Sequence, residues 1–178
     1  KTLDSLLNIL HRHQILPVIA PLAHGYGWKG MRSLGPGVVA DEYARFTKYL
    51  LARYGDKPAC YLLCLDGHAD EPGVVPSGKI LQQWDSYQQP TGLHYNPCDD
   101  FLAGWATAKD SFHCFHLNRK HQDEEWLDFQ WAQTGHDGLH LYHKVERMYN
   151  NKPTRANMAG EPTYEKMGQG KHGLGWWQ

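Results

Sequence analysis

Short apolar runs alternate with longer stretches of helical spacing along this chain, and that alternation constrains its fold most strongly. Residues 15–23 and 59–65 are continuous apolar runs, short enough for buried strands. Between them, residues 38–54 carry apolar side chains three and four positions apart, as an amphipathic helix does. Strands that alternate with helices predict a parallel sheet, because a parallel connection needs a crossover segment that a helix supplies.

The same periodicity predicts about five strand–helix units along the whole chain. Strands are expected at 15–23, 59–65, 92–95, 127–132 and 154–159, helices at 2–13, 38–54, 79–88 and 138–150, and a polar loop at 67–78. Such units build either an open α/β sheet or a TIM (β/α)8 barrel. A full barrel usually needs about 250 residues, and the chain has 178. If the units belong to a barrel, the single domain over 1–178 is a partial one.

Polar side chains follow the predicted strands and distinguish the two architectures. The residues in these positions are His24, Asp66, His94, Gln133 with His136, and Glu161. Because each follows a different strand, the carboxyl ends of the strands would carry a ring of functional groups, as a barrel rim does. An open sheet would instead concentrate its ligands at one switch point. The pattern therefore favours an α/β fold that is a partial TIM barrel.

Two carboxylates at this rim predict a chemistry. Asp66 ends the second apolar run and Glu161 ends the fifth. A facing pair of carboxyl groups can cleave a glycosidic bond, since one attacks the anomeric carbon and the other protonates the leaving oxygen. Glu161 is the expected nucleophile and Asp66 the expected acid/base, although Asp70 and Glu71 compete for the acid role.

Three segments resemble one family of barrel enzymes. Residues 52–58 read Ala-Arg-Tyr-Gly-Asp-Lys-Pro and lead into the strand before Asp66. Residues 128–136 end in Gln-Thr-Gly-His, and residues 160–165 read Gly-Glu-Pro-Thr-Tyr-Glu. These segments, in this order, resemble the apiosidase-like glycoside hydrolases.

The resemblance implies an O-glycosyl hydrolase that acts on plant-type polysaccharides by a retaining mechanism. In such enzymes the acid/base follows strand four and the nucleophile follows strand seven. Asp66 and Glu161 differ by the same number of strand steps, so the chain would run from about strand three to strand seven of a barrel incomplete at both ends. The family also implies an extracytoplasmic location, either secreted or periplasmic.

Further side chains at the predicted rim suit a carbohydrate partner. Hydrogen-bonding and aromatic groups that could hold a sugar are His24, Trp28, His94, Gln133, His136 and Tyr164. Imidazole and amide groups pair with hydroxyls, and aromatic faces stack on sugar rings. Packing within the fold is the alternative role for each of them.

Charge and motif content argue against several other classes. The net charge is −1, with 18 basic and 19 acidic residues, which suggests neither a nucleic acid nor a membrane partner. No glycine-rich phosphate motif is present, so no cofactor is expected. The histidine clusters 113/116 and 136/140/143 lack the helical His-Glu-x-x-His pattern, and no metal is expected. A metal-dependent barrel hydrolase and a non-catalytic, carbohydrate-binding barrel fragment remain as alternatives.

Overall fold

The computed structural model describes residues 2–23, 39–65, 69, 71–95, 119–133 and 141–161, and within 141–144 it describes the backbone alone. Its helices are α1 (Thr2–Arg12), α2 (Ala40–Tyr54), α3 (Val74–Trp84) and α5 (Leu141–Tyr149). Its strands are β1 (Val18–Ile19), β2 (Cys60–Leu63), β3 (Thr91–Tyr95), β4 (Phe129–Gln133) and β5 (Ala156–Glu161).

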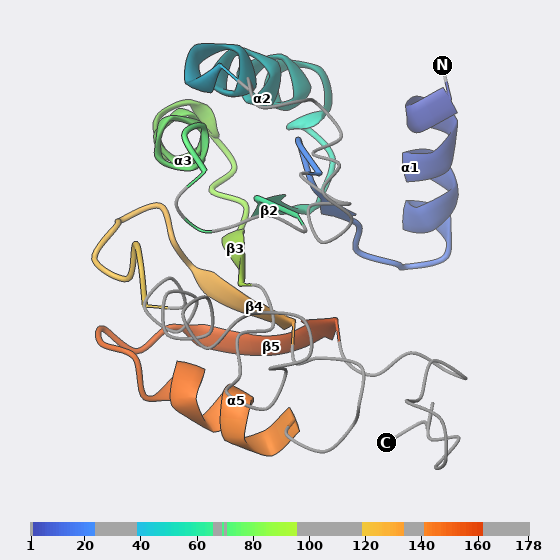
Figure 1. The fold of residues 1–178 in the computed structure, drawn as a ribbon. Coiled ribbons are helices and arrows are strands. Elements are labelled where there is room, and N and C mark those ends of the chain that lie inside the picture. Colours follow the sequence, from blue (N-terminus) through green and yellow to red (C-terminus); the bar gives the residue numbers. More distant parts are fainter. Residues whose placement is uncertain are drawn as a thin grey trace, which may run out of the picture.

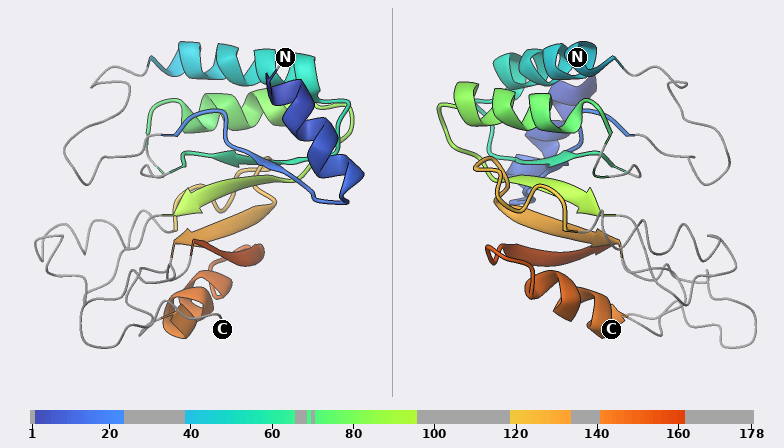
Figure 2. Two further views of the ribbon diagram at one scale, coloured as in Figure 1. Left: turned by 90° about the vertical axis from the view of Figure 1, so that its right-hand side faces the viewer. Right: turned by 60° about the vertical axis from the view of Figure 1, so that its left-hand side comes forward.

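The five strands form one parallel sheet whose spatial order is the order of the sequence, β1-β2-β3-β4-β5. The sheet curls into a half-barrel, with α2 and α3 outside its upper part and α5 outside its lower part (Figure 1). Figure 2 shows that β3, β4 and β5 point towards the same end of the molecule. The prediction of a partial (β/α) barrel is therefore confirmed.

Most predicted elements form close to their expected bounds, and two differ for identifiable reasons. Helix α3 begins at Val74, inside the predicted loop 67–78. The N–H groups of the first helical turn have no partner within the helix, so Pro76, which has no N–H, fits in that turn. The predicted strand 15–23 is reduced to β1 and an isolated bridge between Ala23 and Leu65. Pro21 has no N–H to donate to the ladder between these two points.

The last two strands also extend beyond their predicted ends. Strand β4 continues to Gln133 and β5 continues to Glu161, one and two residues beyond the predicted ends at 132 and 159. The two polar residues are therefore the last residues of their strands and have fixed backbone directions.

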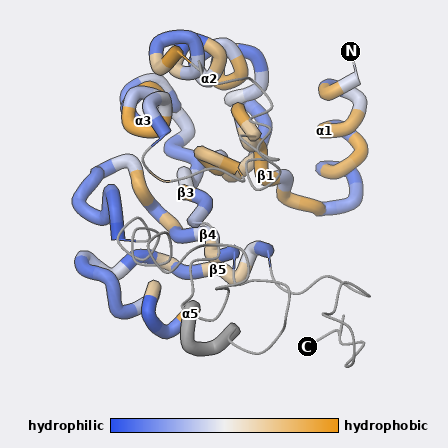
Figure 3. The backbone as a smooth tube through the Cα atoms, viewed as in Figure 1, coloured by the Kyte–Doolittle hydropathy of each residue, from blue (hydrophilic) through white to orange (hydrophobic). Residues whose placement is uncertain are grey.

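The main core lies between the sheet and its outer helices. Its largest fully buried side chains include Tyr61, Leu63, Leu81, Leu93 and Tyr95. Every residue of β3 is buried, as expected for a central strand of a parallel sheet. The hydropathy colouring in Figure 3 is more hydrophobic along β1 and β2 than along β5. Among the described helices, none combines the length and apolar composition needed to cross a bilayer.

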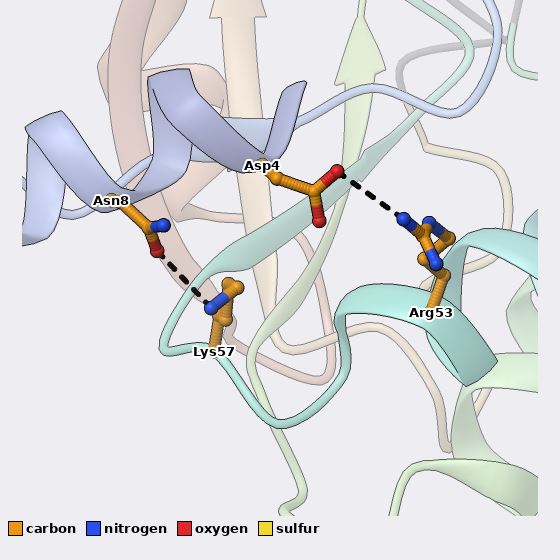
Figure 4. A network of polar contacts seen from close by, with 4 residues as sticks. All are labelled: Asp4, Asn8, Arg53 and Lys57. Carbon is orange, nitrogen blue, oxygen red and sulfur yellow. Dashed lines mark hydrogen bonds and ion pairs between the residues drawn. The ribbon is translucent and has the colours of Figure 1, made fainter. Parts of the chain in front are cut away.

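Helix α1 is attached beside the sheet by a small apolar cluster and a polar edge. Leu7 of α1 packs with Leu50 and Tyr54 of α2. Along the edge, Arg53 donates to Asp4 at 3.3 Å, and Lys57 donates to the Asn8 side-chain oxygen at 3.3 Å (Figure 4). The polar contacts are exposed, so the apolar cluster supplies most of the attachment.

Candidate active site

The direction of side chains in β4 and β5 identifies the concave face of the half-barrel. Gln130 donates to the carbonyl of Met148, and Asn157 donates to the carbonyl of Val145, so both side chains point to α5. Side chains alternate between the two faces of a strand. Phe129, Trp131 and Gln133 of β4 therefore face the concave side.

The register extends this assignment to β3. His94 is paired with Trp131, and paired residues of neighbouring strands point to the same face. His94 accordingly lies on the concave face, and it is fully buried. Gly92 lies on the same face, where the ring of Phe129 covers it so closely that a Cβ at this position would be 2.2 Å from the ring.

A histidine and a glutamate meet at the carboxyl ends of the strands. His94 Nε2 is 3.2 Å from Glu161 Oε2, and the two side chains are 0% and 15% exposed. An ionised carboxylate only accepts hydrogen bonds, so in that state the imidazole carries its proton on Nε2 and donates it. The contact holds the Glu161 carboxylate in one direction while leaving part of it accessible.

Gln133 completes the described part of this site. It is 8% exposed and stands directly opposite Glu161 in the register of β4 and β5. The structure thus brings together three residues that the sequence predicted separately, from three neighbouring strands. The partnership of His94 with Glu161 was not predicted. The sequence indicated only that both residues lie near the ends of strands.

The other predicted site residues lie outside the described residues. They are Asp66, His24, Trp28, His136 and Tyr164. Their roles stay predictions, as does the choice among Asp66, Asp70 and Glu71 for the acid.

The chain just before Asp66 adopts an uncommon backbone conformation. Cys64 is buried with φ 62°, in the left-handed region that residues with a Cβ rarely occupy. Its N–H donates to the Tyr43 hydroxyl of α2 at 3.2 Å. Burial raises the pKa of the Tyr43 hydroxyl, which therefore stays protonated at ordinary pH. Backbone strain of this kind often occurs beside functional residues, where the surrounding structure maintains it.

Among the described residues, no group of three or more histidine, cysteine, aspartate or glutamate side chains is placed to hold a metal ion. The described part of the site offers a carboxylate with a buried hydrogen-bond donor and an amide opposite it. This combination can present a nucleophilic oxygen and bind hydroxyl groups.

Comparisons with known proteins identify the family. No curated protein and no solved structure matches the chain. The sequence model of the apiosidase-like catalytic domain matches residues 1–177, nearly the whole chain. The half-barrel of parallel strands and the polar groups at its carboxyl end agree with a domain of glycosidase type. This chain therefore belongs to the apiosidase-like catalytic domain family.

Proposed function

We propose that the protein is a retaining glycoside hydrolase that cleaves O-glycosidic bonds of plant-type polysaccharides, with Glu161 as nucleophile and Asp66 as acid/base. The observation that carries the proposal is the buried His94 imidazole, whose Nε2 lies 3.2 Å from Glu161 Oε2. A retaining enzyme needs an aligned, ionised carboxylate as its nucleophile, and barrel enzymes carry their catalytic groups at the carboxyl ends of their strands. A buried donor beside Glu161 favours that ionised form.

The reaction proceeds in two displacements. A carboxylate oxygen of Glu161 attacks the anomeric carbon while the Asp66 carboxyl gives its proton to the leaving oxygen, and a covalent glycosyl-enzyme forms. Asp66, now ionised, then removes a proton from water, and the water oxygen displaces Glu161 from the anomeric carbon. His94 keeps Glu161 aligned through both steps, and Gln133 binds a hydroxyl of the sugar.

The test uses a panel of 4-nitrophenyl glycosides that includes an apioside, because the family is named for an apiosidase. We expect release of 4-nitrophenol from at least one member. Proton NMR should show a first product with the anomeric configuration of the substrate. Glu161→Gln should abolish turnover, while Glu125→Gln, which changes an exposed carboxylate, should leave it intact.

Azide addition separates the proposed mechanism from its alternatives. In Glu161→Ala, azide can enter the vacated position and should restore turnover, forming a glycosyl azide of inverted configuration. Turnover that a chelator abolishes would instead indicate a metal-dependent hydrolase. A chain that binds the glycosides without hydrolysing them, unchanged by Glu161→Gln, would be a carbohydrate-binding fragment.

A further inference from the structure

The indole of Trp131 lies directly on Gly160, the residue before Glu161. A Cβ added at position 160 would be 1.9 Å from Cε2 and 2.3 Å from Nε1 of that indole. Carbon atoms in proteins do not approach so closely. Residue 160 is therefore restricted to glycine by the position of the ring, and not by a left-handed backbone.

This contact coincides with an irregularity in the pairing of β4 and β5. Trp131 pairs with Met158, whereas Gln133 pairs with Glu161. The interval is two residues on β4 (133 − 131) and three on β5 (161 − 158), so β5 contains one extra residue. Such a bulge commonly re-aims a side chain next to an active site.

The bulge determines which face Glu161 occupies. Asn157 points to α5, so strict alternation would direct 159 and 161 to the same helix-covered side. A shift of one residue moves the following side chains to the opposite face. The extra residue therefore brings Glu161 onto the concave face, opposite Gln133 and within 3.2 Å of His94.

Among the described residues, the indole of Trp131 makes packing contacts and no hydrogen bond. Trp131 Nε1 is buried and has no hydrogen-bond partner among the described residues. A buried donor without a partner lowers stability. The contact with Gly160 therefore explains the position of the ring.

We propose that Trp131 is a positioning residue: its indole, seated on Gly160, maintains the β5 bulge that turns Glu161 towards His94. The inference rests on the proposed role of Glu161 as the nucleophile. It assigns no contact between Trp131 and the substrate. The ring acts through the backbone of residues 160 and 161.

The experiment compares two alanine substitutions at glycines that each lie under an indole. Gly160→Ala is the test. Gly78→Ala is the matched control, because a Cβ at Gly78 would lie 2.3 Å from Cδ2 of Trp126, in helix α3 and away from the concave face. Both variants should lower the melting temperature. Only Gly160→Ala should lower kcat, by about 100-fold as for a displacement of a reacting group by an ångström or so, with KM little changed.

A second-site variant tests the contact itself. Trp131→Leu in the Gly160→Ala background makes room for the Cβ, so the melting temperature and kcat should both recover in part. Trp131→Leu alone should lower kcat less than Gly160→Ala does, and Trp126→Leu should leave kcat unchanged. If Gly160→Ala does not fold, the pair Trp131→Leu and Trp126→Leu supplies the comparison.

Contrary results are distinct from failure of the proposed function. A folded Gly160→Ala with the kcat of the wild type would overturn the inference, as would kcat losses that are equal for the two tryptophan variants. If the wild-type chain hydrolyses none of the glycosides, the proposed function fails. The melting temperatures of the single and double variants at 131 and 160 would then still test the contact, and additive changes would refute it.

Discussion

The two faces of the half-barrel sheet use their side chains in different ways. On the helix-covered face, Gln130 donates to the Met148 carbonyl at 3.0 Å and accepts from Asn151 at 2.8 Å, both within the buried interior. On the concave face, His94 meets a carboxylate, and the Trp131 indole keeps a buried N–H without a partner among the described residues. The Gln130 bonds stabilise the packing of α5 on the sheet, whereas the polar groups of the concave face converge on Glu161. Buried polar atoms without a partner among the described residues occur on both faces, as at Asn157 Oδ1 and Trp131 Nε1.

Among the substitutions that compare the two faces, His94→Ala is expected to have the largest effect on activity. Removing the buried donor takes away the hydrogen bond that aligns the Glu161 carboxylate, and kcat should fall on the order of 100-fold. His94→Gln should recover part of the loss, since its amide can donate. His11→Ala is the matched control, because His11 Nε2 also makes a hydrogen bond, to the Pro58 carbonyl at 2.8 Å, outside the concave face. Wild-type kcat in His94→Ala would remove the functional distinction between the faces.

Gln130→Ala should have the largest effect on stability. It removes the two buried hydrogen bonds that Gln130 makes with the Met148 carbonyl and the Asn151 amide, so the free energy of unfolding should fall by about 1–3 kcal/mol. The kcat of the folded protein should stay unchanged. Urea denaturation measures the free energy of unfolding. Gln82→Ala is the control, because the Gln82 amide donates to the carboxylate of an exposed residue, Glu125. A fall in kcat as large as that of His94→Ala would show that the faces are not separable.

Tyr95→Phe sharpens the comparison within the helix-covered face. The Tyr95 hydroxyl donates to the Lys120 carbonyl at 2.8 Å and accepts from the Gln122 amide at 2.9 Å. Its loss should lower the free energy of unfolding by about 1–2 kcal/mol. An unchanged urea midpoint would mean that these bonds add nothing to stability.

Tyr61→Phe should have the smallest effect at neutral pH. The Tyr61 hydroxyl is buried without a partner among the described residues, so its removal should leave the stability equal or slightly higher. Burial raises the pKa of Tyr61 to about 12. In the unfolded chain the hydroxyl ionises near its ordinary pKa of about 10, so the folded state holds the proton more tightly. Compared with its ionised form, the protonated Tyr61 hydroxyl therefore adds to the free energy of unfolding. The added stability is fully present below about pH 10 and is lost as the pH rises towards 12.

The same variant supplies the pH test. Urea midpoints measured between neutral pH and the alkaline range should fall less steeply for Tyr61→Phe than for the wild type. Tyr95 also has a raised pKa because of burial, so a residual fall should remain in Tyr61→Phe. Identical alkaline profiles would show that the Tyr61 hydroxyl does not titrate with unfolding.

Much of the fold was predictable because its signals are local. The apolar stripe of 38–54 and the continuous run of 59–65 led to α2 and β2 with small shifts of their bounds. The start of α3 was wrong, since glycine and proline near Pro76 resemble loop signals. Gly78 does not mark a loop, because it lies within α3, where the Trp126 ring leaves no room for a larger residue.

The candidate site was predictable only in part. The strand-end positions of His94, Gln133 and Glu161 followed from the alternation of strands and helices, because parallel strands share one carboxyl edge. The family resemblance added a role for Glu161, which remains a prediction together with that of Asp66. Neither signal indicated which of these side chains touch.

Periodicity along the chain predicted the parallel sheet, and the polar residues after the strands favoured a partial barrel and indicated the edge at which polar groups collect. Both signals depend on properties of neighbouring residues. The pairing of His94 with Glu161, 67 residues apart, needed the folded sheet. So did the bulge under Trp131, since one extra residue in β5 changes the face of Glu161 without any change in local apolar pattern. Register and contact across strands arise from packing among distant residues, and packing is settled only when the strands assemble.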